Sequence, residues 1–128
     1  MTHPNAEVVE RAFSAFGRDA LVVARTIADD IVWRVPGTNA MSGEYTGRDA
    51  VLQFLRQTVV LSDGTYRTEL QYVVADDVLA VAVYLARGER EGRALDIEQA
   101  LFCVLRDGQI VDVTAVPFDF EAFDSFWA

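Results

Sequence analysis

Hydrophobic residues recur at helical spacing in the first half of the chain. Val9, Phe13 and Phe16 lie at i, i+4 and i+7, which places them on one face of a helix. Asn5 is the expected N-cap of this helix, and Gly17 is the expected stop. The spacing therefore predicts a first amphipathic helix between these two residues.

A second helix and a strand are expected next. Asp19 can cap a helix that we expect to reach Asp30, and the apolar run at residues 31–35 is typical of a strand. Pro36 has no N–H group to donate, so it should end the strand or mark an edge. The glycine-rich segment 37–47 is interpreted as a loop.

A third helix is expected after this loop. Thr46 and Asp49 resemble a capping box in which aspartate replaces glutamate. Val51, Phe54 and Leu55 then share one helix face.

The second half of the chain alternates between apolar and polar residues, which is typical of strands. Turn signals at residues 76–77, 91–92 and 107–108 divide it into four strands of a meander that Pro117 ends. The tail from residue 118 has aromatic residues at helical spacing and could form a short amphipathic helix over something apolar.

The expected architecture is a single α+β domain over residues 1–128. Three N-terminal helices should pack on a strongly curved mixed sheet that is mostly antiparallel, in a cone-shaped α+β barrel. Such a sheet wrapped on a helix leaves an apolar cavity, which is the default ligand site.

Composition narrows the classes of function. Hydrophobic residues make up 52% of the chain, which is enough to fill a core. The net charge is −9, and this negative charge disfavours binding to nucleic acid or to an anionic membrane. The only cysteine, Cys103, permits no intrachain disulfide, and a cytoplasmic location is expected. The only histidine, His3, argues against a histidine-based triad or metal site, and no metal or cofactor is expected.

Several segments in this order resemble the SnoaL-like branch of the nuclear-transport-factor-2-like superfamily. They are W-R-V-P-G at 33–37, G-E-Y-T-G-R-D-A-V at 43–51 and R-D-G-Q-I-V-D-V at 106–113. The superfamily includes ketosteroid isomerase, polyketide cyclases and limonene epoxide hydrolase, as well as members without known activity. The resemblance implies the cone-shaped fold more firmly than any one reaction.

The resemblance also indicates where relatives carry catalytic groups. The base of ketosteroid isomerase corresponds to Val35 and its oxyanion-hole tyrosine to Ala12, while no aspartate falls in 98–101, where its protonated aspartate is expected. The histidine and aspartate of the cyclases correspond to Val113 and Ala115. These positions are apolar here, which disfavours the usual family chemistry.

The candidate pocket residues follow from strand alternation and family register. Trp33 and Val35 share one face of the first strand, and Ala82 and Tyr84 share one face of a later strand. The resemblance places both faces in the cavity, where the Tyr84 hydroxyl could donate to a substrate oxygen. Five further residues are candidate substrate contacts: Phe16, Tyr45, Phe54, Val113 and Ala115.

Glu98 is the best remaining candidate for a catalytic acid or base. If its face of the strand points into the cavity, burial would raise its pKa toward neutrality. The alternative is a solvated strand face or a surface ion pair, and the sequence leaves both open.

The outer face of the meander is also apolar at Val81, Val83 and Leu85, which favours a homodimer through the sheet.

Three functions remain open. The protein could be a cofactor-free isomerase, cyclase or hydrolase that acts on a small hydrophobic molecule. It could also bind such a molecule without turning it over, or be an accessory dimer whose pocket its own tail fills.

Overall fold

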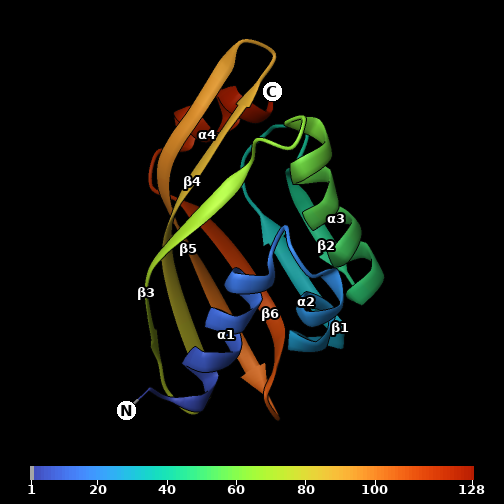
Figure 1. The fold of residues 1–128 in the computed structure, drawn as a ribbon, viewed down its shortest axis with the longest axis vertical. Coiled ribbons are helices and arrows are strands. Elements are labelled where there is room, and N and C mark those ends of the chain that lie inside the picture. The colour runs from blue at the N-terminus through green and yellow to red at the C-terminus, as the bar shows by residue number, and fades with distance from the viewer. Residues whose placement is uncertain (1) are drawn as a thin grey trace.

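The computed structural model describes residues 2–128. Four helices and six strands lie in this part of the chain (Figure 1). Their order is α1 (Pro4–Ala15), α2 (Ala20–Thr26), β1 (Ile27–Val35), β2 (Gly43–Thr46), α3 (Arg48–Leu61), β3 (Arg67–Ala75), β4 (Leu79–Arg90), β5 (Arg93–Arg106), β6 (Gln109–Pro117) and α4 (Phe120–Trp127). None of these helices is long and apolar enough to cross a membrane.

All six strands form one mixed sheet in the order β2-β1-β6-β5-β4-β3. Only the β1–β6 pair is parallel, and the other neighbours are antiparallel. The α+β class and the curved, mostly antiparallel sheet are therefore confirmed. The sheet remains open between its edges, β2 and β3, so helices rather than strand pairing complete the cone (Figure 1).

The segment around β1 differs from the sequence-based prediction in two ways. Helix α2 ends at Thr26, so β1 begins at Ile27 rather than at Ile31. Part of the predicted loop forms β2, which pairs with β1 so that Trp33 lies opposite Tyr45. Both differences arise because β1 gains a strand partner on each side, and tertiary pairing overrides local propensity.

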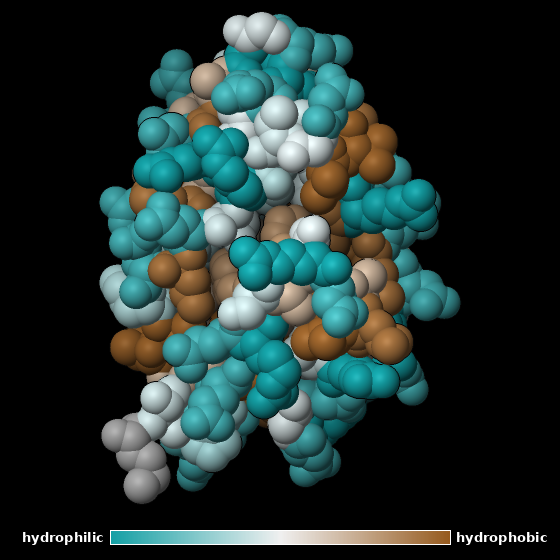
Figure 2. Space-filling model, viewed as in Figure 1, coloured by the Kyte–Doolittle hydropathy of each residue, from teal (hydrophilic) through white to brown (hydrophobic). Residues whose placement is uncertain are grey.

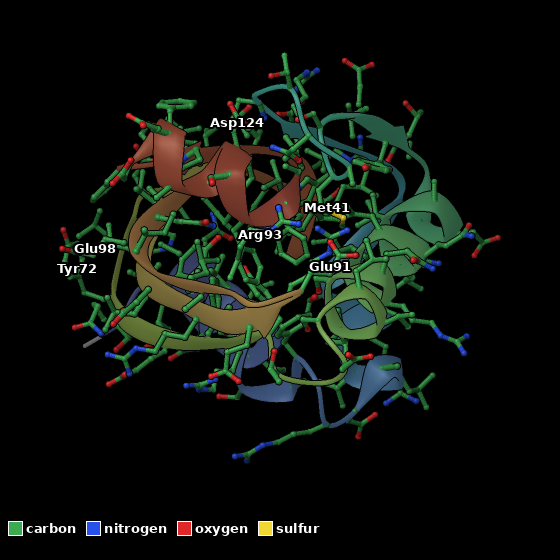
Figure 3. The ribbon with its side chains drawn as sticks, turned by 90° about the horizontal axis from the view of Figure 1, so that it is seen from above. Met41, Tyr72, Glu91, Arg93, Glu98 and Asp124 are labelled. Atoms are coloured by element: carbon green, nitrogen blue, oxygen red, sulfur yellow. The ribbon has the colours of Figure 1, made fainter. Side chains whose placement is uncertain are left out.

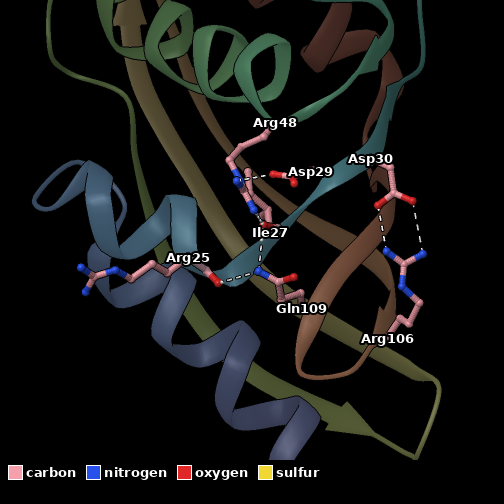
Figure 4. A network of polar contacts seen from close by, with 7 residues as sticks. All are labelled: Arg25, Ile27, Asp29, Asp30, Arg48, Arg106 and Gln109. Carbon is pink, nitrogen blue, oxygen red and sulfur yellow. Dashed lines mark hydrogen bonds and ion pairs between the residues drawn. The ribbon is translucent and has the colours of Figure 1, made fainter.

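Polar side chains hold the start of β1 in place (Figure 4). The Ile27 carbonyl oxygen accepts hydrogen bonds from Arg48 Nη2 at 2.8 Å and from Gln109 Nε2 at 3.4 Å. Arg106 donates to both carboxylate oxygens of Asp30, at 2.9 and 3.2 Å. These contacts tie α3 and the β5–β6 turn to the β1 segment that the sequence alone assigned to a helix.

Helix caps agree only in part with expectation. Asp19 caps α2 as predicted, since its carboxylate accepts from the Leu21 and Val22 amides. Helix α1 instead begins after His3, whose Nδ1 accepts from the Asn5 amide. Gly47, not a threonine, precedes α3.

Helix α4 is a fourth helix beyond the predicted three, and it forms in the tail where an amphipathic segment was considered possible. Its buried residues are Phe123, Phe126 and Trp127. Two arginines of the β4–β5 hairpin hold its C-terminal end: Arg90 donates to the Ala128 carbonyl oxygen at 2.7 Å and Arg93 to that of Ser125 at 2.6 Å. Cations at a helix C-terminus satisfy carbonyl groups that lack helical partners.

The loop between β1 and β2 holds the other side of α4. The Asp124 carboxylate accepts hydrogen bonds from the Thr38 amide at 3.0 Å and from Asn39 Nδ2 at 2.7 Å. The Ala40 amide donates to the Trp127 carbonyl oxygen at 3.1 Å. Helix α4 is thus fixed as a cover at one end of the sheet, between this loop and the β4–β5 hairpin (Figure 1).

We expect Gly37→Ala to destabilise the protein by roughly 1–3 kcal/mol. Gly37 has a φ of +91°, and a Cβ atom there would clash with Asp124 Oδ1, so the loop or α4 must move. Urea unfolding monitored by circular dichroism measures the change.

Gly92→Ala is the matched control. Gly92 also has a positive φ, of +77°, but a Cβ atom added there would meet no heavy atom within 4 Å. If both variants lose the same stability, backbone strain alone explains the effect and the contact with α4 does not constrain the loop.

Candidate functional site

A cavity of about 100 Å³ lies between the concave face of the sheet and the helices. Its lining is mainly apolar and comes from all four helices and from five strands. The lining includes Ala12, Phe13, Trp33, Phe54, Tyr84 and Gln99.

Most of the residues predicted from the sequence lie around this cavity. Those that line it are Phe16, Trp33, Val35, Phe54, Tyr84, Val113 and Ala115. Ala82 is fully buried on the same face of β4 but does not border the cavity. Tyr45 does not border it either, because its ring packs behind Phe54 at a centroid distance of 4.5 Å.

Glu98 does not reach the cavity. It lies on the outer face of the sheet and is exposed to solvent (Figure 3). Of the two alternatives that the sequence left open, the structure shows the solvated strand face, so Glu98 is not placed to act as an acid or base in the cavity. The residues of β5 that line the cavity are Gln99, Leu101 and Cys103.

Aromatic rings form two walls of the cavity. Trp33 packs against Phe54 from α3, with their ring centroids 5.7 Å apart. Phe13 from α1 packs against Tyr84 from β4 at 5.0 Å. Both centroid distances lie within the range of about 4.5–7 Å at which aromatic pairs attract each other.

Tyr84 and Gln99 form a polar pair inside this apolar lining. They are opposite each other in the β4–β5 register, and Gln99 Nε2 donates a hydrogen bond to the Tyr84 hydroxyl oxygen at 2.8 Å. Both side chains are almost completely buried, with 4% of Tyr84 and 3% of Gln99 exposed. The pair is the most deeply buried contact between two polar side chains in the described part of the chain.

Two buried polar atoms of cavity-lining residues have no hydrogen-bond partner among residues 2–128. They are the indole Nε1 of Trp33, a donor, and Oε1 of Gln99, an acceptor. By contrast, the hydroxyl groups of Thr26 and Thr58 donate to carbonyl oxygens within their own helices. Unsatisfied buried groups are rare in folded proteins, so these two mark the polar chemistry that the cavity offers.

The ionisable groups around the cavity are held neutral. Burial, aided by the nearby Tyr66, raises the pKa of the Tyr84 hydroxyl well above its ordinary value, and burial likewise raises the pKa of Tyr66. Burial also raises the pKa of the Cys103 thiol to about 12. The lining contains no aspartate, glutamate, lysine or arginine side chain, so it presents hydrogen-bonding groups without charge.

A groove at the surface adjoins the cavity between the end of α1 and the start of β3. It shares Phe13, Phe16, Tyr66 and Thr68 with the cavity lining and has a volume of about 460 Å³. The space-filling view shows a hollow in this face of the molecule, with hydrophobic atoms visible between hydrophilic side chains (Figure 2). The shared residues place this groove directly beside the cavity.

Sequence reasoning missed Gln99, although a signal for it was present. The two-residue turn at Glu91 and Gly92 pairs Arg90 with Arg93, and the same register places Gln99 opposite Tyr84. Counting from that turn identifies the glutamine rather than Glu98 as the inward polar residue.

A family model describing the SnoaL-like domain matches residues 9–113. The chain belongs to the SnoaL-like family. An uncharacterized protein from Mycobacterium tuberculosis is 34% identical over 124 residues, which cover 95% of each chain. Among solved structures, Bal32a from a soil-derived mobile gene cassette has a TM-score of 0.94 and 25% identity over 98% of this chain and 97% of that one. TerC co-crystallized with polyporic acid has a TM-score of 0.83 and 19% identity over 97% and 98%.

Four positions that the family resemblance matches to catalytic groups of relatives border this cavity, and all four are apolar: Ala12, Val35, Val113 and Ala115. Among the described residues, no group of three or more His, Cys, Asp or Glu side chains is placed to hold a metal ion.

We expect Tyr84→Phe to lower the free energy of unfolding by about 1–3 kcal/mol, because the Gln99 amide then loses its partner while it remains buried. Chemical denaturation measures the change. Tyr72→Phe is the control: the Tyr72 side chain is 56% exposed, so its hydroxyl keeps water as a partner and the change should stay within about 0.5 kcal/mol. Equal stability of Tyr84→Phe and wild type would contradict a buried hydrogen bond at this position.

Proposed function

We propose that this SnoaL-like protein binds a small hydrophobic molecule in the cavity between the sheet and the helices. The observation that carries the proposal is the unfilled apolar space that Phe13, Trp33 and Phe54 border. Ligand sites are typically concave and apolar, with a few convergent polar groups that set orientation. Tyr84 and Gln99 are such groups here.

One comparison structure supports a ligand-binding role. TerC has the same fold and was co-crystallized with polyporic acid, so at least one protein of this shape was studied with an organic ligand.

Helix α4 contributes Phe123 and Trp127 to the lining without filling the cavity. This favours a binding site over the accessory dimer whose tail occupies its own pocket.

The lining favours binding and hydrogen-bond polarisation over proton transfer by a carboxylate. Glu98 is outside, and the positions of family acids and bases are apolar. The Tyr84 hydroxyl can still donate a hydrogen bond to a ligand oxygen. Such a neutral donor stabilises negative charge that develops on that oxygen during a reaction. Any turnover in this cavity would therefore depend on neutral groups such as Tyr84.

Toluene is a suitable probe because it has the size of one aromatic ring and no hydrogen-bonding group. We expect it to raise the melting temperature of the wild-type protein and to change the fluorescence of Trp33 and Trp127, which both line the cavity. Ala12→Leu adds an isopropyl group to the lining and should abolish both effects.

The control is Ala20→Leu, the same substitution at an exposed position at the start of α2. It should leave toluene binding unchanged. If toluene affects neither signal in the wild-type protein, or if Ala12→Leu binds it as well as the control does, the cavity is not the ligand site.

We also propose that a second copy of the chain covers the outer face of the sheet. Large side chains are exposed there in one patch across β3, β4 and β5: Tyr72, Val74, Leu79 and Phe102. Of the residues predicted for this face, Val83 is already buried within the monomer, while Val81 and Leu85 are half-buried.

The charges around this patch suit a symmetric pairing. Arg34 and Asp112 lie on one side of it and Arg87 and Asp96 on the other, so each side carries both signs. In a two-fold interface the same patch meets itself, and a mixed rim allows opposite charges to face each other.

Phe102→Lys tests this interface, because it puts a charge in the middle of the patch. Sedimentation equilibrium should give twice the 14.2 kDa chain mass for the wild type and the mass of one chain for the variant. Leu21→Lys is the control, since Leu21 is 62% exposed on α2, away from the sheet. A wild-type protein that sediments as a monomer at all concentrations would refute the dimer.

A further inference from the structure

The Tyr84–Gln99 pair has hydrogen-bonding capacity that the protein leaves unused. Gln99 Nε2 donates to the Tyr84 oxygen, while Gln99 Oε1 has no partner among residues 2–128. The proton of the Tyr84 hydroxyl likewise has no acceptor in this part of the chain. Because an unsatisfied buried group costs about 1–3 kcal/mol, a pair that leaves two unused requires a physical explanation.

The two unused capacities lie side by side and are complementary. Tyr84 supplies a donor and Gln99 supplies an acceptor, and both residues line the cavity. A hydroxyl group fits this arrangement because it accepts and donates through one oxygen atom. An ether or ketone can only accept, so it would leave Oε1 of Gln99 unsatisfied.

Size and charge restrict the rest of the ligand. The cavity of about 100 Å³ is of the same order as an apolar cavity of ~150 Å³ that takes up benzene, so it suits a single ring. The Phe13 ring packs against Tyr84, which places an aromatic surface next to the polar pair. Because the lining has no cationic side chain, a carboxylate would be buried without a counter-charge.

We propose that the cavity selects neutral single-ring compounds that carry a hydroxyl group, with Tyr84 donating to the hydroxyl oxygen and Gln99 Oε1 accepting its proton. This inference rests on the proposed function, since it specifies the ligand of the same cavity. It adds a specificity role for Gln99, a residue that was not among those predicted from the sequence.

Phenol, toluene and anisole separate the possibilities. Phenol can donate and accept, anisole can only accept, and toluene does neither while matching phenol in size. Transfer from water alone favours toluene over phenol. We therefore expect NMR titration of the wild-type protein to show tighter binding of phenol than of toluene or anisole, against the order set by transfer.

Gln99→Leu should lower the phenol-to-toluene affinity ratio by at least about tenfold, the value of one hydrogen bond to an otherwise unsatisfied group. Gln53→Leu, at an exposed position on α3, is the matched control and should keep the wild-type ratio. Tyr84→Phe is a second variant that should also lose the preference for phenol.

Each outcome distinguishes the inference from the proposed function. If wild-type protein binds toluene as tightly as phenol, the proposed recognition of the hydroxyl group is wrong while the hydrophobic site stands. The same conclusion follows if Gln99→Leu keeps the wild-type ratio of phenol affinity to toluene affinity. If none of the three compounds binds, the proposed function fails and the inference fails with it. The wild-type comparison remains decisive even if a variant does not fold.

Discussion

The register of the β4–β5 hairpin is the constraint on which the rest of the structure depends. Glu91 and Gly92 form its turn with φ values of +50° and +77°, a conformation that matches the twist of antiparallel strands. This turn sets twelve successive residue pairs, from Arg90–Arg93 to Leu79–Val104. Because a slip of one residue would turn every side chain to the other face, the turn decides which residues meet the helices and which meet solvent.

The same register determines the chemistry of the cavity. Small residues of β4, such as Ala80 and Ala82, lie beneath the helices, and they leave room that larger side chains would occupy. Tyr84 and Gln99 face each other in this apolar surrounding, while Glu98 points to the opposite side. The hairpin also carries Arg90 and Arg93, whose contacts with the end of α4 hold the cover over the sheet. One turn thus positions both the polar pair and the helix that encloses it.

Sequence patterns predicted the fold because its major elements are long and strongly periodic. The meander, its three turns and the Asp19 cap were predictable from alternation and turn residues, whereas the inward face of Tyr84 followed from the family resemblance. The β1–β2 segment was not, because β1 starts only where tertiary contacts such as Arg48 and Gln109 satisfy its first carbonyl group. Glu98 was ambiguous since apolar residues occur on both faces of β5, and only the hairpin register separates it from Gln99.

The unused groups of the cavity have a consequence for stability. An unfilled apolar space and two unsatisfied atoms, Trp33 Nε1 and Gln99 Oε1, each lower the stability of the ligand-free protein. Replacing Tyr84 by phenylalanine and Gln99 by leucine together would remove the unsatisfied groups without leaving either partner stranded, so packing alone does not explain why the polar pair is there. A ligand that satisfies Oε1 stabilises only the folded state, because the paired strands that place Gln99 beside Tyr84 exist only there. Stability and recognition therefore oppose each other at Gln99, as is common where a fold departs from its best packing to serve a site.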